Sequence, residues 1–403
     1  MSETVVAPRI RGFICTTAHP EGCAANVRAQ AEVARAARSE DTPARPYRVL
    51  VLGASTGYGL AARIAATFLY GAETLGVFFE KPGEGTKTAS PGWYNTAAFD
   101  HIARQEGHNP LHLNGDAFSE AIRQTVVERI RETMGQVDCV VYSLAAPRRT
   151  DPETGEVYSS VLKPIGEPFH GKTIDLNKEV VTEIQIDPAT EAEIAGTVRV
   201  MGGDDLRLWT NALLAGGVLA PGAVVVPLSY IGPEVTHGIY RSGTIGRAKE
   251  DLEATTRALD AELTEKIGGR ALVSVNKAVV TQASAAIPVV PLYYSTLTSV
   301  LKEQNRHEEP IHQMVRLFQT QIGPGQTPTL DNEQRIRMDD WEMAPDVQAE
   351  VARRWPQITT ENLAEQTDYA GYKRGFRQLF GFEVDGVNYD TPVEVEAKVS
   401  GLS

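Results

Sequence analysis

Short apolar runs rich in β-branched residues recur along the chain, and polar turns or helical patterns separate them. Runs of this kind are typical of strands buried on both faces of a parallel sheet. We expect strands at residues 47–52, 74–80, 111–114, 137–143, 222–228 and 271–276. Because segments with helical periodicity lie between these strands, the pattern predicts an α/β protein with a doubly wound parallel sheet.

Other patterns extend this alternation at both ends of the chain. A short strand is expected within residues 10–19, and an alanine-rich helix is expected at 24–38, ending before Pro43 and Pro46. An Asp-Gly pair between apolar residues predicts a β-hairpin at 382–389. Helical patterns also mark residues 189–216, 288–301, 312–321, 344–354 and 360–366.

The polar, proline-rich stretch 148–186 is too long for a simple crossover, so we expect an insertion that covers the functional site. The whole chain, 1–403, is expected to form one large domain. Its core comprises 47–147 and 206–325, while 148–205 form the insertion and 326–403 a C-terminal addition.

Composition narrows the class of function. A net charge of −13 argues against nucleic acid or an anionic membrane as a main partner. The chain begins without a leader-like pattern and has no apolar run long enough to span a bilayer, so we expect a cytoplasmic protein. His19 lies between Cys15 and Cys23, but the spacing is irregular and a fourth ligand is missing. We therefore expect no metal site, and a third cysteine, Cys139, fits a reducing compartment.

The first strand of the alternation runs directly into a glycine-rich turn and a helix. Such a turn lets the backbone approach a pyrophosphate, while free N–H groups and the helix dipole face the negative charge. The G-x-x-x-G-x-G spacing is the variant typical of short-chain dehydrogenases, although three glycines in a turn can also serve packing alone. The expected cofactor-binding residues of the turn are Gly53, Ala54, Ser55, Thr56, Gly57 and Tyr58.

The next strand ends at Glu80, about 20 residues beyond the glycines, where a carboxylate can accept from the adenosine ribose hydroxyls. A carboxylate there disfavours a 2′-phosphate, so NADH is favoured over NADPH; a solvated strand end is the alternative. Asp116 could flank the adenine or cap its own turn. The remaining expected cofactor contacts are Phe79, Ala117, Leu144, Ala145, Val279, Val280 and Thr281.

Tyr240 and Lys249 are the candidate catalytic pair. Nine steps of about 100° would place them on opposite sides of one helix. They can converge only if the helix begins between them, with Thr244 as a plausible N-cap. The ammonium would then lower the tyrosine pKa and suit it to a carbonyl substrate. Tyr230, at the end of the fifth strand, is either a second donor that shapes the substrate site or an ordinary buried aromatic.

Tyr369 and Lys373 have the Y-x3-K spacing that places both groups on one helix face. They come well after the sixth strand, where a doubly wound domain has completed its active site. We therefore interpret them as structural.

Eight segments follow one another along the chain in a recognisable order: 9–19, 53–59, 77–82, 114–118, 142–145, 230–236, 243–250 and 275–284. Together they resemble the FabV-type enoyl-acyl carrier protein reductases and the related trans-2-enoyl-CoA reductases. The resemblance implies a Rossmann-type, short-chain-dehydrogenase-like fold, NADH as cofactor and a largely monomeric enzyme.

This resemblance implies reduction of a trans-2-enoyl thioester at the end of a fatty-acid elongation cycle, on either acyl carrier protein or CoA. In this interpretation hydride reaches C3, Tyr240 stabilises the enolate oxygen and C2 is protonated. Lys249 would hold the nicotinamide ribose, and Arg148 and Arg149 hint at a basic patch for an acidic carrier. A short-chain ketoreductase and a non-catalytic NAD-binding module are the alternatives.

Overall fold

The computed structural model describes residues 3–38, 46–285 and 287–402, and its centre is a parallel sheet. Pro43, at which the helical pattern was expected to break, lies outside the described residues. The strands follow the order β15 (Ile336–Arg337), β14 (Ser274–Val275), β12 (Leu219–Ser229), β7 (Val137–Tyr142), β4 (Arg48–Leu52), β5 (Glu73–Phe78) and β6 (Leu111–Asn114). The chain order therefore reverses between β4 and β7, the position at which doubly wound sheets bind ligands.

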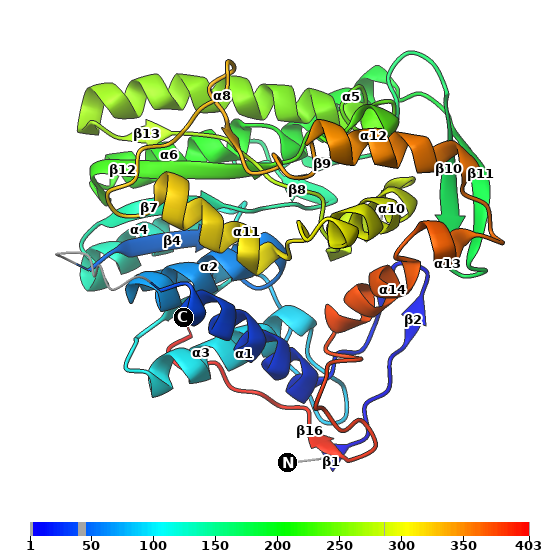
Figure 1. Ribbon diagram of the computed structural model, residues 1–403. Coiled ribbons are helices and arrows are strands. Elements are labelled where there is room, and N and C mark those ends of the chain that lie inside the picture. The colour runs from blue at the N-terminus through cyan, green and yellow to red at the C-terminus, as the bar shows by residue number, and fades with distance from the viewer. Residues whose placement is uncertain (1–2, 39–45, 286, 403) are drawn as a thin grey trace.

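Helices cover both faces of this sheet (Figure 1). On one face lie α1 (Pro20–Ala36), α2 (Gly57–Tyr70), α3 (Pro91–Gln105) and α11 (Pro310–Leu317). On the other lie α4 (Glu120–Thr133), α6 (Asp204–Ala215) and α8 (Thr244–Ile267). Each layer closes one apolar core, so both sheet faces are buried, as the continuous apolar strands predict.

A third apolar core lies beyond the carboxyl ends of the strands. It is built by α10 (Val290–Glu303), α12 (Pro345–Arg354) and α14 (Tyr369–Gln378), which gather at one end of the molecule in Figure 1. The chain then returns to its start, because β16 (Val393–Glu394) pairs with β1 (Glu3–Thr4). The C-terminal segment is thus packed into the fold along its length. No helix among the described residues is long and apolar enough to cross a membrane.

The expected insertion is made of two β-hairpins and a helix. The first hairpin joins β8 (Arg148–Thr150) to β9 (Val157–Ser159), and the second joins β10 (Phe169–Asp175) to β11 (Val180–Ile186). The helix α5 (Glu191–Met201) packs on α8. The remaining short elements are β2 (Ile10–Arg11), β3 (Ile14–Cys15), α7 (Glu234–His237), β13 (Arg270–Ala271), α9 (Gln282–Ala285), η1 (Phe318–Ile322), η2 (Trp355–Gln357) and α13 (Leu363–Gln366).

Several boundaries differ from the sequence expectation. The helical pattern at 189–216 breaks into α5 and α6, because the backbone at Gly202 is extended (φ −81°, ψ −159°) and ends α5. The sixth strand is not continuous but is divided between β13 and β14. The hairpin at 382–389 is wrong: no strand forms there, and the Tyr389 hydroxyl bonds the backbone of the turn instead. The edge strand β15 was not predicted.

Candidate active site

The turn between β4 and α2 forms a cradle that only glycine can build. Gly53 has φ +84°, and a Cβ there would lie 2.1 Å from the Ser143 carbonyl oxygen. A Cβ on Gly59 would lie 1.9 Å from the Gly53 carbonyl oxygen. Thr56 is the N-cap of α2, and its side chain makes no capping hydrogen bond. The first N–H groups of α2 are therefore free to meet an anion.

Glu80 faces this turn. The Ser55 hydroxyl donates to Glu80 Oε1 at 2.7 Å, and the Asn114 side chain fixes the Glu80 backbone at both its N–H and its carbonyl. A Cβ on Gly92 would lie 2.0 Å from Glu80 Oε1, so the carboxylate is closely enclosed on that side. The oxygen atoms of Glu80 thus lie beside the cradle, as a ribose acceptor requires, rather than at a solvated strand end.

The other expected adenosine contacts are arranged differently from one another. β5 ends one residue before Phe79, whose side chain is 76% exposed and points away from the protein. Asp116 caps its own turn by accepting from the Phe118 N–H at 2.9 Å. Ala117 is buried, and its carbonyl accepts from the Trp209 indole N–H. Leu144 follows β7 and its side chain reaches the Gly53 turn, with Ala145 next along the chain.

The segment after β14 closes the cradle from the opposite side. The Tyr58 hydroxyl donates to the Lys277 carbonyl oxygen at 2.7 Å. The Thr281 methyl group would be 3.4 Å from a Cβ on Gly57, while its hydroxyl accepts from the Ser284 N–H. Val279 and Val280 are buried between them. The predicted contacts at 57–58 and at 279–281 are therefore neighbours in the structure, although they are far apart in the sequence.

Gln313 of α11 was missed by the sequence analysis. Its Oε1 accepts from the Lys277 N–H and from the Asn276 amide, and it is fully buried. It therefore fixes the start of the segment that follows β14. A lone glutamine inside a helical pattern gives no signal of such a role.

Tyr240 lies in the turn between α7 and α8, and Lys249 lies in the second turn of α8. The helix thus begins between them, as their spacing required. Its N-cap is Gly243 rather than Thr244, because the Thr244 hydroxyl donates to Val161 of the insertion instead. A Cβ on Gly246 would lie 1.7 Å from the Arg241 carbonyl oxygen, so glycine is needed where the turn enters the helix.

The electrostatics of this pair differ from the expectation. Both side chains are buried, Tyr240 at 7% exposed and Lys249 at 8%. Burial raises the pKa of Tyr240, with no opposing effect from the ammonium, so the expected lowering is wrong for this structure. Burial also lowers the pKa of Lys249 to about 8, and the charge of Glu253 partly opposes this shift. The reason is desolvation, which disfavours the charged form of each group.

Tyr230 directly follows β12 and contacts Tyr240. Its ring meets the Tyr240 ring edge to face, with centroids 5.1 Å apart. Its hydroxyl donates to Glu342 Oε1 at 2.9 Å, and burial raises its pKa well above the usual value. Glu342 was not among the expected site residues, because it follows β15 in an acidic run that is typical of a solvated turn.

The residues interpreted as structural have structural contacts. The Lys373 ammonium pairs with Glu179 at 2.9 Å and lies over the Tyr369 ring. His19 caps α1, since its Nδ1 accepts from the Gly22 N–H. Within the described part of the chain, no group of three or more metal-ligating side chains comes together.

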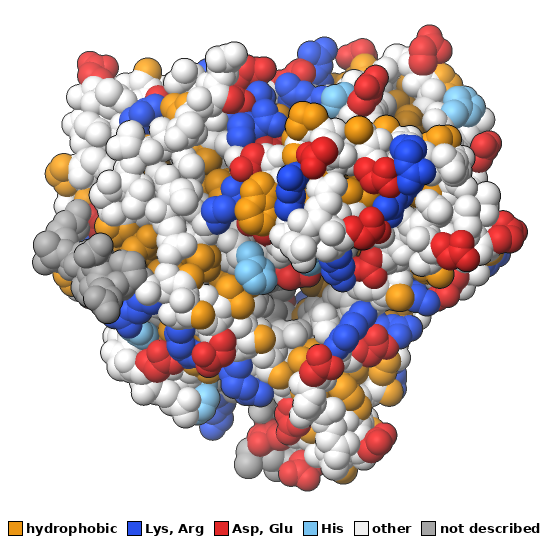
Figure 2. All heavy atoms as spheres, in the orientation of Figure 1, with side chains coloured by type: hydrophobic (Ala, Val, Ile, Leu, Met, Phe, Trp, Pro, Cys, Tyr) orange, Lys and Arg blue, Asp and Glu red, His pale blue; other side chains and the backbone are white. Residues whose placement is uncertain are grey.

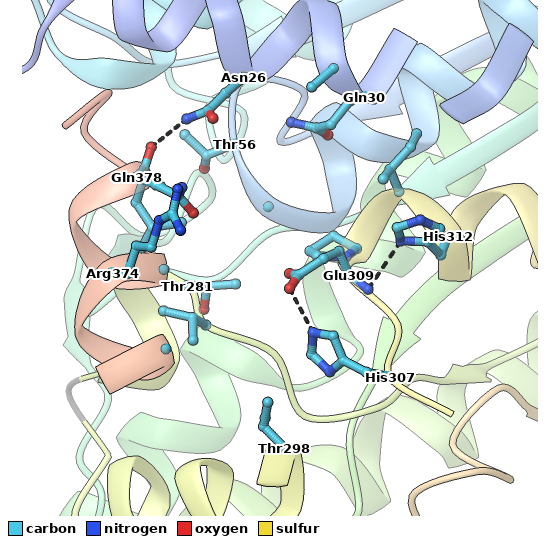
Figure 3. A pocket seen from close by; sticks show the side chains of 18 of the residues that line it. Asn26, Gln30, Thr56, Thr281, Thr298, His307, Glu309, His312, Arg374 and Gln378 are labelled. Carbon is cyan, nitrogen blue, oxygen red and sulfur yellow. Dashed lines mark hydrogen bonds and ion pairs between the residues drawn. The ribbon is translucent and has the colours of Figure 1, made fainter. Parts of the chain in front are cut away.

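A cavity of about 520 Å³ leads to the cradle. It is lined from α1, α2, α10, α11 and α14, and it reaches Thr56, Gly57, Val280 and Thr281. Figure 3 shows Thr281 and Thr298 pointing into it, with Arg374 on one wall and His307 and Glu309 on the other. Figure 2 shows a hollow in the middle of the face it draws, rimmed by side chains of both charges. Tyr230, Tyr240 and Lys249 do not line this cavity.

This geometry defines a class of protein. The cradle and the enclosed carboxylate lie at the reversal point of a doubly wound sheet, and a pair of buried phenols follows β12 of the same sheet. This is the arrangement of a dinucleotide-dependent oxidoreductase.

Comparison with known proteins places the chain within that class. Residues 87–322 match the family model described as the trans-2-enoyl-CoA reductase catalytic region. Residues 5–85 match the NAD(P)H binding domain of trans-2-enoyl-CoA reductase, and 330–393 match the enoyl reductase FAD binding domain. The chain therefore belongs to the trans-2-enoyl-CoA reductase family, which confirms the resemblance expected from the sequence.

Full-length relatives agree. An enoyl-[acyl-carrier-protein] reductase [NADH] of Coxiella burnetii is 52% identical over 99% of this chain and 98% of its own. A trans-2-enoyl-CoA reductase [NADH] of Ruminiclostridium cellulolyticum is 50% identical over 99% of this chain and 100% of its own. The solved Treponema denticola trans-2-enoyl-CoA reductase in complex with NAD is 46% identical, covers 98% of this chain and 99% of its own, and has a TM-score of 0.93. The expected fold class is confirmed.

The family model that matches residues 330–393 is described as an FAD binding domain, which implies a flavin site in this segment. Residues 330–393 form β15, α12, α13 and α14, whose interior is filled by Val347, Val351, Tyr372 and Phe376. The described residues of this segment contain no strand, glycine turn and helix of the kind that cradles a pyrophosphate. Asp368, Arg374 and Asp385 line the cavity that leads to the α2 cradle, and residues 333–335 line a second cavity against α8. These residues do not fit a resident FAD.

Proposed function

We propose that the protein uses NADH to reduce the C2=C3 double bond of trans-2-enoyl thioesters, with Tyr240 and Lys249 as its catalytic residues. The enzyme class and the cofactor expected from the sequence are confirmed by the family and by full-length relatives named as NADH-dependent. The observation that supports the assignment of residues is the edge-to-face contact of Tyr240 with Tyr230, which directly follows β12 of the parallel sheet. No hydrogen bond among the described residues engages the Tyr240 hydroxyl, so this donor is available to a substrate.

The mechanism follows from where the chain's own groups lie. Bound NADH supplies the hydride for C3. The α2 N-terminus would hold the pyrophosphate, and Glu80 would accept from the adenosine ribose. Tyr240 donates a hydrogen bond to the thioester oxygen as negative charge develops there. The enolate then returns to the thioester as C2 takes up one proton from solvent. The raised pKa of Tyr240 keeps the phenol protonated at neutral pH, so it acts as a donor from the start.

Lys249 gives the first testable prediction. With a pKa of about 8, the ammonium is present below this pH and is lost as the pH rises. If its charge holds the cofactor, kcat/KM for NADH should be constant at low pH and should fall above pH 8. Lys249→Met should lower the plateau about tenfold and remove the fall. Lys266→Met, on the exposed end of the same helix, is the control and should leave the profile unchanged. A fall that persists in Lys249→Met would assign the titration to another group.

The second testable prediction concerns the carrier of the acyl chain. The hint of a basic patch at Arg148 and Arg149 is weakened, because Arg149 is 2% exposed and pairs with Asp204. We therefore propose that the thioester itself is recognised and that enoyl-CoA is turned over. Initial rates with NADH against matched enoyl-CoA and enoyl-acyl carrier protein should give kcat/KM values within about tenfold of each other, a difference of about 1.4 kcal/mol. A much larger preference for the carrier protein would contradict this proposal.

We also propose that the enzyme acts as a cytoplasmic monomer. In support of a monomer, few large apolar side chains are exposed among the described residues. They are Val5, Ile10, Phe13 and Ile14 near the N-terminus and Phe79, Val157 and Leu402 elsewhere. Light scattering at assay concentration should give the mass of one chain, 43.8 kDa.

A further inference from the structure

Glu342 is a fully buried carboxylate in the C-terminal segment, and each of its oxygens is occupied. Oε1 accepts from the Tyr230 hydroxyl at 2.9 Å and from the Tyr293 hydroxyl at 2.6 Å. Oε2 accepts from the Ala278 N–H at 2.6 Å. Three donors around two oxygens match the acceptor-only chemistry of an ionised carboxylate.

These three donors come from separate parts of the site. Tyr230 directly follows β12 and packs on Tyr240, whereas Ala278 lies in the segment after β14 that closes the cofactor cradle. Tyr293 belongs to α10, and Gln348 of α12 donates to the Glu342 carbonyl oxygen at 2.6 Å. Lys277 is buried nearby, and its ammonium donates to the Ala278 carbonyl oxygen. One side chain therefore connects the substrate side of the site with the cofactor side.

The hydrogen-bond direction also distinguishes the two tyrosines. A phenol has one proton, and that of Tyr230 is directed at the Glu342 carboxylate. Its oxygen is left only with lone pairs toward the substrate, so it cannot donate to an enolate without breaking a charge-assisted bond. The Tyr240 hydroxyl makes no hydrogen bond among the described residues, so its proton is free for a substrate.

We propose that Glu342 is a positioning residue for the reduction, which holds Tyr230 and the Ala278 backbone in place and leaves Tyr240 as the sole phenolic donor. This inference rests on the proposed function. The oxygens of Glu342 are occupied by Tyr230, Tyr293 and the Ala278 N–H, so it acts through Tyr230 and the segment after β14.

Glu342→Gln tests this role while keeping the size of the side chain. Its amide can offer one acceptor oxygen but must present an N–H₂ group to either the two phenols or the Ala278 N–H. We expect the Kd for NADH to rise about tenfold and kcat to fall about 10- to 30-fold, the effect of losing one or two hydrogen bonds to a charged group. The control is Asp138→Asn, a buried carboxylate that accepts from Arg48 at the amino end of the sheet. It should lower thermal stability without changing either constant.

A double-mutant cycle separates positioning from simple destabilisation. Tyr230→Phe should lower kcat less than about 30-fold, far less than Tyr240→Phe. Adding Glu342→Gln to Tyr230→Phe should cost less than Glu342→Gln costs alone, because the bond between these two side chains is already lost and only those to Tyr293 and Ala278 remain. Two outcomes would overturn the proposal. One is a loss in Tyr230→Phe as large as in Tyr240→Phe, and the other is full additivity of the two changes.

The measurements remain informative in two difficult cases. If Glu342→Gln does not fold, Tyr293→Phe removes one donor from the same oxygen and should lower kcat several-fold; an unchanged kcat would then contradict the proposal. Fluorescence titration of NADH needs no turnover. An inactive wild-type protein would therefore refute the proposed function, whereas an unchanged Kd in Glu342→Gln would refute this inference.

Discussion

Replacing Tyr240 by phenylalanine should lower kcat about 10²- to 10⁴-fold with saturating NADH and enoyl thioester, while the Kd for NADH changes less than about twofold. The hydroxyl is the only atom removed, and it makes no hydrogen bond that the described fold would lose. Its contribution is made where charge develops on the thioester oxygen, so the loss should be specific to the transition state.

The control for this change is Tyr47→Phe. Tyr47 is also 7% exposed, and its hydroxyl donates to the Ile322 carbonyl oxygen at the amino end of β4. It should lower the thermal midpoint by a few degrees, as expected for the loss of about 1 kcal/mol, and leave kcat unchanged. Equal losses of turnover and of NADH affinity in Tyr240→Phe would show that Tyr240 binds the cofactor instead of acting on the substrate.

Replacing Glu80 by glutamine should change the choice of cofactor. The ratio of kcat/KM for NADPH to that for NADH should rise about 10- to 100-fold, because the carboxylate no longer repels a 2′-phosphate and no longer accepts as strongly from the ribose. Glutamine keeps an oxygen for the Ser55 hydroxyl and fits the space beside Gly92, so the cradle should be preserved.

Glu84→Gln removes the same charge from the exposed loop that follows, and it should leave the cofactor ratio unchanged. If Glu80→Gln also leaves the ratio unchanged, the carboxylate does not face the ribose, and its bond to Ser55 is only structural.

Much of this site could be predicted because its signals are local. The cradle is a continuous stretch in which Gly53 needs a positive φ and Gly59 a close backbone approach, and both demands exclude a side chain. The placement of Tyr240 before a helix and of Lys249 within it followed from the helical repeat alone. The buried strands followed from continuous apolar runs.

Other features depend on groups that are distant in sequence. The hairpin at 382–389 has the correct turn residues, yet the Tyr389 hydroxyl occupies the backbone groups that a strand pair would use. The pKa of Tyr240 is raised and not lowered, because burial of the phenol decides it and the Lys249 ammonium has no opposing effect. Neither the missing hairpin nor the raised pKa can be predicted from the local sequence pattern.

The sequence by itself determined the doubly wound sheet, the glycine turn after β4 and the start of α8 between Tyr240 and Lys249, since periodicity and glycine geometry act over a few residues. Only the tertiary structure decided that β15 completes the sheet and that Glu342 binds Tyr230 across 112 positions of the chain. A carboxylate in an acidic run has the same sequence pattern whether it is solvated or buried. Its role is set by the donors that folding brings to it.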